Sequence, residues 1–214
     1  MKFRSFLFSV FITFTVNNAI AQDENEVVVS QSPYIPYLVG GVNWTTISGV
    51  DNQSDINRFA TFNLGFGFLT LINTPRPMSL TVEASFSEQG YKLNDVRRNS
   101  NPEYIKLRYI NIPAVLRFNL TKNSNLYLGV GPQVGFLVDD RIIAKDGSKS
   151  RFGEGDLNKT VFDAVGTLGT SFGGRADMGI ELRFQGGLNK FILDEPEYRH
   201  SVLQVRLIMP AFFF

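Results

Sequence analysis

The stretch that decides the fold is Met178-Gly179-Ile180-Glu181-Leu182-Arg183-Phe184-Gln185. Large apolar residues alternate in it with glycine and with polar or charged residues. Successive side chains of a β-strand point to opposite faces of the sheet. The stretch therefore predicts a strand with one apolar face and one polar face.

Seven other segments repeat this alternation. The eight predicted strands cover residues 37–46, 59–71, 79–88, 105–120, 126–138, 162–172, 178–188 and 201–214. The connections between them alternate between long and short, starting with a long one. A membrane barrel shows this order when short turns lie on the periplasmic side and long loops lie outside. The sequence therefore predicts an all-β fold, an eight-stranded antiparallel up-and-down transmembrane β-barrel.

The fourth segment changes its pattern partway along. Ile105, Leu107 and Tyr109 share one parity, whereas the apolar residues from Ile110 onward share the other. A β-bulge produces such a change within one strand, and Pro113 lacks the N–H that a ladder needs. We therefore expect a bulge in this strand.

The N-terminus predicts export. Lys2 and Arg4 precede an apolar run at residues 6–16, and small residues then lead to Ala21. This layout is typical of a secretory signal peptide cleaved between Ala21 and Gln22. The alternative, an N-terminal anchor, is disfavoured because a spanning helix needs about 20 apolar residues. The expected location is the outer membrane of a Gram-negative envelope.

The expected domains are a signal peptide at 1–21, a short periplasmic segment at 22–36 and the barrel at 37–214. Without the signal peptide, 19 basic residues face 20 acidic ones, a net charge of −1. No basic excess therefore points to nucleic acid. Cysteine is absent, which excludes disulfides and thiolate metal ligands.

A soluble barrel of the lipocalin kind is the competing fold. Its apolar faces would point inward around a ligand, and its polar faces would meet water. The polar faces here are rich in Gly, Ser, Thr and Asn and contain few Lys or Glu residues. The large residues are Phe, Leu and Val, as a lipid-facing band requires. These features favour the membrane barrel.

If the apolar faces meet lipid, several charges line the lumen. They are Glu83, Arg117, Glu181, Arg183 and Arg206. Eight strands leave an interior just wide enough for side chains, so we expect these charges to pair across it. Three positive groups face two negative ones, so Asp163 or a loop carboxylate would complete the network. The alternative is a narrow pore that weakly favours anions.

Chemistry-bearing motifs are weak. The lone histidine, His200, adjoins Ser201, but neighbouring strand residues face opposite sides, so His200 is interpreted as a rim histidine. The acidic residues of the longest loop match no calcium-loop spacing. Gly129-Val130-Gly131 lacks the third glycine and the helix of a nucleotide-binding loop. We predict no catalytic, metal or cofactor site.

Four short motifs are spread over nearly all of the mature chain. They are Leu38-Val39-Gly40-Gly41-Val42-Asn43, Glu83-Ala84-Ser85-Phe86-Ser87-Glu88-Gln89-Gly90-Tyr91, Leu107-Arg108-Tyr109-Ile110-Asn111-Ile112-Pro113 and Leu128-Gly129-Val130-Gly131-Pro132. In these motifs the chain resembles the PorT-like outer-membrane β-barrel family. The terminal Phe214 is similar to the aromatic last residue that bacterial barrels present to their assembly machinery. The resemblance implies the fold and the location, and it transfers no activity.

The leading functional hypothesis is a non-enzymatic barrel that acts as a membrane scaffold or as a loop-mediated recognition surface. The alternatives are the narrow pore and an accessory component of a protein-secretion or envelope-assembly complex. The expected partners are outer-membrane lipid, the barrel-assembly machinery through the C-terminal strand, and a protein at the outer loops. No nucleic acid is expected.

Overall fold

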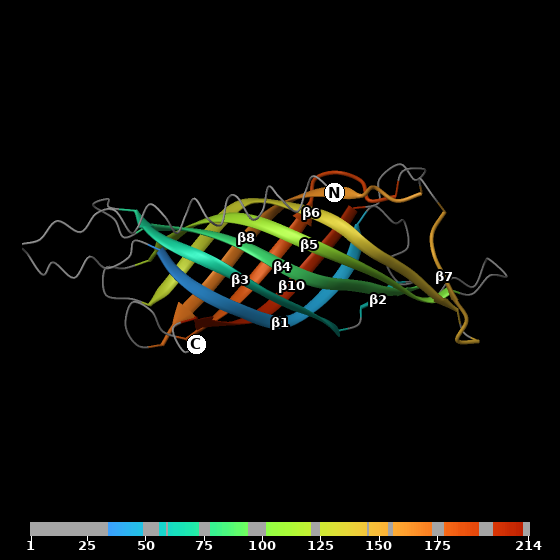
Figure 1. Cartoon of the computed structure of the whole chain (residues 1–214), viewed down its shortest axis with the longest axis horizontal. Coiled ribbons are helices and arrows are strands. Elements are labelled where there is room, and N and C mark those ends of the chain that lie inside the picture. The colour runs from blue at the N-terminus through green and yellow to red at the C-terminus, as the bar shows by residue number, and fades with distance from the viewer. Residues whose placement is uncertain are drawn as a thin grey trace, which may run out of the picture. The chain divides into compact units, whose positions relative to one another are not determined.

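Eight long strands form one antiparallel sheet that closes on itself (Figure 1). Each strand pairs with its neighbours in the chain, and the first pairs with the last. They are β1 (Tyr34–Ser48), β3 (Ala60–Ile72), β4 (Met78–Leu93), β5 (Pro102–Asn119), β6 (Leu126–Ala144), β8 (Thr160–Ser171), β9 (Gly179–Gly187) and β10 (Arg199–Pro210). The predicted eight-stranded antiparallel up-and-down barrel is confirmed.

This computed structural model describes residues 34–48, 56–58, 60–72, 78–93, 102–120, 125–144, 146–153, 156–172, 178–192 and 199–211. They belong to one unit, Pro33–Phe214, whereas a second unit, Met1–Ser32, lies outside the described residues. The predicted cleavage site between Ala21 and Gln22 and the terminal Phe214 also lie outside them. No helix in the described ranges is long and apolar enough to cross a membrane.

Two short strands extend the barrel wall within the long connections. Strand β2 (Ile56–Arg58) pairs with the last residues of β4, and β7 (Lys149–Ser150) pairs with β6. Short connections join β3 to β4, β5 to β6 and β8 to β9. We call the end of the barrel with these connections the turn end and the opposite end the loop end. β1 begins and β10 ends at the turn end.

The barrel wall has an apolar outer face and a mostly polar inner face. On β3, Phe62, Leu64 and Phe66 are exposed, whereas Thr61 and Asn63 between them are buried. The same alternation runs along the other long strands. It follows from the period of two in a strand, because one face must suit lipid and the other must fit a narrow interior.

The bulge expected within residues 105–120 is wrong, and the additional residue that β5 does contain, Glu103, precedes this stretch. Burial alternates along β5 without interruption, so Ile105, Leu107 and Tyr109 face the interior just as Arg117 does. A register shift does occur beside Arg108 and Tyr109, but the additional residue is Val138 of the partner strand β6. The change of pattern in β5 therefore reflects a change in what surrounds the strand.

The outer face of β5 shows where that change lies. It is apolar from Ile110 to Phe118 and carries Arg108 and Lys106 beyond this stretch. A tilted membrane strand crosses the apolar layer with about 9–11 residues, which matches the apolar part of β5. Toward the loop end, the outer face becomes charged and the inner face becomes apolar. Strands β4, β5 and β6 thus continue beyond the apolar band.

Candidate functional site

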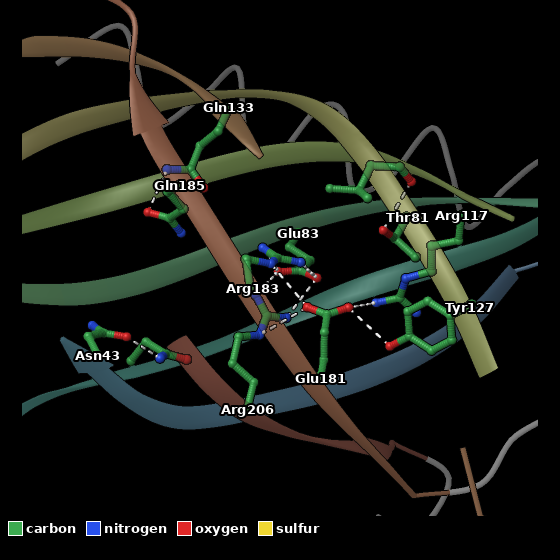
Figure 2. A network of polar contacts seen from close by, with 12 residues as sticks. Asn43, Thr81, Glu83, Arg117, Tyr127, Gln133, Glu181, Arg183, Gln185 and Arg206 are labelled. Atoms are coloured by element: carbon green, nitrogen blue, oxygen red, sulfur yellow. Dashed lines mark hydrogen bonds and ion pairs between the residues drawn. The ribbon is translucent and has the colours of Figure 1, made fainter. Parts of the chain in front are cut away.

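Five charged side chains meet inside the barrel (Figure 2). Their positions in the strands put them in the half nearer the turn end. They are Glu83 of β4, Arg117 of β5, Glu181 and Arg183 of β9, and Arg206 of β10. Alternation along each strand points them inward, and strand pairing places Glu181 opposite Arg206. The structure therefore brings together all five residues that the sequence assigned to the lumen. We call them the lumen network.

Glu83 binds two arginines. Its carboxylate accepts two hydrogen bonds from Arg183, at 3.0 and 2.8 Å, and two from Arg206, both at 2.9 Å. The hydroxyl of Tyr37 donates to the same carboxylate at 2.7 Å. Such forked arginine–carboxylate pairs are among the stronger hydrogen bonds in proteins and fix the orientation of both groups.

Glu181 completes the network from the neighbouring position. It accepts hydrogen bonds from Arg117 at 2.9 Å, from Nε of Arg183 at 3.0 Å and from the hydroxyl of Tyr127 at 3.0 Å. Side-chain exposure across the lumen network is at most 5%. Charges this deeply buried are tolerated only when they are paired and hydrogen-bonded, so each member depends on the others.

The sequence suggested that Asp163 balances the surplus positive charge of the lumen network. The structure does not place it there. Asp163 instead accepts a hydrogen bond from Gln133 at 2.7 Å, away from the arginines. Arg117 lies over two aromatic rings, with its guanidinium carbon 4.6 Å from the centroid of Tyr127 and 5.9 Å from that of Tyr37. The face of an aromatic ring attracts a cation, so these rings offset part of the surplus.

Two glycines make room for those tyrosines. Gly67 is the cross-strand neighbour of Tyr37, and Gly169 is the neighbour of Tyr127. A Cβ at Gly67 would lie 2.7 Å from the Tyr37 ring, and one at Gly169 would overlap the Tyr127 ring. The space that these glycines leave is therefore filled by side chains. The sequence interpretation missed both tyrosines, because the glycines that make room for them lie on neighbouring strands and are matched to them only by the register.

A layer of amide side chains lies next to the lumen network, toward the loop end. Asn63 donates to the side chain of Asn43, while Asn43 donates to the carbonyl oxygen of Phe62 at 3.0 Å. Across the barrel, Gln133 bridges Asp163 and Gln185, at 2.7 and 3.3 Å. The contact between Gln133 and Gln185 joins β6 to β9, and Asn43 also donates to the side chain of Ser87 on β4 at 3.1 Å. Both hydrogen bonds pass over an intervening strand, so the layer reaches into the interior.

An apolar cluster fills the loop end. Its buried members are Tyr91, Ile105, Leu107, Tyr109, Leu157, Val161 and Phe191. Leu157 and Phe191 come from the third and fourth long connections, which a bridge between Leu157 and Ile192 joins. The Asn158 N–H donates to the carbonyl of Phe191 at 2.8 Å and holds the two segments together. The connections thus place their own side chains in the mouth of the barrel.

His200 lies in this cluster rather than on the rim. It is buried, stacks on Tyr109 at a centroid distance of 5.8 Å and meets the edge of Phe191 at 6.0 Å. Its Nε2 lies 3.2 Å from Asp163 Oδ1. The rim assignment was wrong because the parity of β10 turns His200 inward beneath Phe191.

The acidic residues that the sequence placed in the longest loop have separate partners, and Asp140 lies in β6. Asp140 accepts from the backbone N–H of Phe152 at 2.8 Å, and Asp146 accepts from that of Ser148 at 2.9 Å. The hydrogen bonds from Ser148 hold the pKa of Asp146 below its usual value. In the part of the chain that the structure describes, no three acidic or histidine residues converge as metal ligands would.

An apolar outer wall around a closed and filled interior defines a small membrane-spanning β-barrel. Over residues 37–193 the chain matches the family described as "Outer membrane protein beta-barrel domain". The chain belongs to this family and is an outer membrane β-barrel protein.

Solved barrels of similar architecture share little sequence with this chain. Neisserial surface protein A matches with a TM-score of 0.47 and 13% identity, over 83% of this chain and 97% of that one. Ail, the attachment invasion locus protein of Yersinia pestis, in complex with the heparin analogue sucrose octasulfate, has a TM-score of 0.41 and 12% identity. This match covers 81% of this chain and 96% of the Ail chain. No curated protein matches the sequence.

Proposed function

We propose that this protein is a non-conducting, non-enzymatic barrel that serves as a membrane scaffold and recognises a partner at its loop end. The observation that carries the proposal is the filled interior. The lumen network, the amide layer and the apolar cluster succeed one another from the turn end to the loop end. Side chains occupy the interior along its whole described length. A partner can therefore be bound at the ends of the barrel and not inside it.

The same filling argues against a pore. A conducting arginine ring needs guanidinium groups that face water. Arg117, Arg183 and Arg206 are instead buried and bound to carboxylates of their own chain. An eight-stranded barrel has little width beyond what these side chains use.

The loop end supports recognition by a protein partner. Strand β6 continues to Ala144, β7 pairs with it, and the third connection is fixed to the fourth through Leu157 and Ile192. Loops that a rigid scaffold holds in place commonly carry binding function. The proposed orientation puts these connections outside the cell and the turn end in the periplasm.

The proposal of a non-enzymatic protein is supported by the surroundings of His200. A nucleophile needs a base within hydrogen-bond reach and access to substrate. His200 is buried between Tyr109 and Phe191, and Ser201 follows it on the opposite face of β10.

We further propose that the chain belongs to the PorT-like group within its family and is exported and assembled as such barrels are. The four shared motifs support this assignment. Residues 1–21 would be removed as a signal peptide, and Phe214 would be presented to the assembly machinery. The periplasmic segment that the sequence placed at 22–36 would be shorter, because β1 already begins at Tyr34 and pairs there with β3.

Planar-bilayer recording of the purified full-length mature protein tests the closed lumen. We expect no stable conductance steps from protein that migrates as a folded species on an unboiled gel. Discrete anion-selective steps from that folded species would contradict the proposal and favour the pore.

Site-specific photo-crosslinking in cells tests recognition at the loop end. A crosslinking residue in place of Ser148, exposed in the third connection, should give a defined adduct with one protein. The matched control replaces Asn125, which is exposed at the turn end. Equal adducts from both positions, or none from Ser148, would count against the proposal. Recovery of a secretion or envelope-assembly component would favour the accessory role.

A further inference from the structure

A second group of charges lies on the outer wall, toward the loop end. Its members are Glu88 of β4, Lys106 and Arg108 of β5, Asp139 and Arg141 of β6, and Arg151 beside β7. We call them the outer charge cluster. Strand pairing sets Arg108 opposite Glu88 on one side and opposite Asp139 on the other. The cluster therefore spans three adjacent strands.

The outer charge cluster contains more arginines than carboxylates. Asp139 is shared by three arginines: Arg108 at 2.9 Å, Arg141 at 2.9 Å and Arg151 at 3.0 Å. Lys106 and Arg108 both contact Glu88, at 3.2 and 3.0 Å. Arg141 and Arg151 thus share one carboxylate with Arg108, and they remain 41% and 70% exposed.

One pair in the cluster runs against the usual preference of a sheet. Lys106 and Arg141 are direct cross-strand partners on the same outer face. Like charges placed directly opposite each other destabilise a β-sheet, and here Glu88 lies beside Lys106 and Asp139 lies beside Arg141. Carboxylates of the chain therefore offset this pair, whereas the three arginines that share Asp139 leave positive charge that an anion from outside the chain would complete.

The position of the cluster identifies what surrounds it. On β5, Arg108 follows the exposed Ile110 on the same face, and on β6, Asp139 follows the exposed Phe136 and Val138. These residues end the apolar band. A barrel wall is surrounded by lipid, so the molecules beside the edge of the band are lipid headgroups.

We propose that the outer charge cluster binds the phosphate groups of an anionic lipid headgroup in the leaflet at the loop end. Guanidinium groups match phosphate oxygens in geometry and are easily desolvated, which makes arginine well suited to this contact. The aliphatic part of each side chain lies on the wall while its charged end reaches the headgroup layer. The bound lipid would supply the negative charge that Asp139 and Glu88 do not.

Native mass spectrometry of the folded full-length mature protein in neutral detergent tests the proposal. The probe is lipid A, a glycolipid with two phosphates, and the comparison lipid is phosphatidylcholine, whose headgroup has no net charge. We expect lipid A to be retained in preference. The double variant Arg141→Gln/Arg151→Gln should weaken retention by at least about tenfold, since each basic residue near a charged surface contributes about a fivefold effect.

The matched control is Lys190→Gln, an exposed lysine in the fourth connection, outside the cluster. It should retain lipid A as the unchanged protein does. As a second measurement on the unchanged protein, retention of lipid A should fall as sodium chloride is raised. Equal loss in both variants, equal retention of phosphatidylcholine, or binding of inorganic phosphate without lipid A would overturn the proposal. The bilayer recording and the crosslinking at Ser148 test the proposed function, and their outcomes do not depend on whether lipid A is retained.

Discussion

The lumen network and the outer charge cluster are built from the same groups, arginine and carboxylate, with opposite results. Inside, two carboxylates and two tyrosine rings engage three arginines, with at most 5% of any charged side chain exposed. Outside, Asp139 is shared by three arginines, of which Arg151 is 70% exposed. A buried charge must find its partner within the chain, whereas a surplus at the membrane edge can be completed by a ligand.

The largest expected effect comes from removing the central carboxylate of the lumen network. Glu83→Gln would remove the negative charge and one of the two oxygens that accept the four hydrogen bonds from Arg183 and Arg206, and it would turn an amide donor toward these buried cations. Breaking a buried pair from one side costs about 3–5 kcal/mol in free energy of unfolding. Urea unfolding in vesicles, read from the fraction that migrates as folded on an unboiled gel, would measure it. A loss below about 1 kcal/mol would mean that water reaches these arginines.

An intermediate effect is expected from Gly169→Ala. The added Cβ would overlap the Tyr127 ring, so that ring must move away from Arg117 and its hydroxyl away from Glu181. Overpacking of this kind costs about 1–3 kcal/mol. The same urea titration applies, with Gly166→Ala as the matched control, because a Cβ there meets nothing within 4 Å. Equal stability of the two variants would show that the lumen has spare room.

The smallest effect is expected in the outer charge cluster. Asp139→Asn removes the shared carboxylate, but its arginine partners are 28–70% exposed and solvent can screen them. Exposed ion pairs contribute about 0–1 kcal/mol, and added salt reduces this further. The loss in free energy of unfolding should be measured for Asp139→Asn and for Glu83→Gln at low and at high salt. The ratio of the two losses then compares the outer charge cluster with the lumen network directly. A loss as large as that of Glu83→Gln would remove the distinction between the two groups.

Most of the barrel could be predicted from the sequence because one rule acts along each strand. Lipid on one side and a narrow interior on the other impose a period of two, as Phe62, Leu64 and Phe66 show in β3. The prediction failed at Ile105, Leu107 and Tyr109, where β5 leaves the apolar band. There the outer face is charged and the inner face is apolar, so the same regular strand shows the opposite pattern.

The inward direction of the five lumen charges also follows from alternation, but their partners do not. Which residues share a level depends on the stagger between strands, and that stagger is set by the closed sheet as a whole. Asp163 points inward as expected, yet the register of β8 places it beside Gln133 and His200 rather than beside the arginines. The surplus is instead met by Tyr37 and Tyr127, whose role depends on glycines in neighbouring strands.

The sealed interior is tested most directly with single cysteines, because the chain has none of its own. Ser85→Cys places a thiol on the buried inner wall of β4, and Ser148→Cys places one in the exposed third connection. A charged methanethiosulfonate reagent should modify Ser148→Cys quickly in the folded protein and leave Ser85→Cys unmodified until the protein is unfolded. Comparable rates at the two positions in the folded protein would show a water-filled lumen and contradict the account.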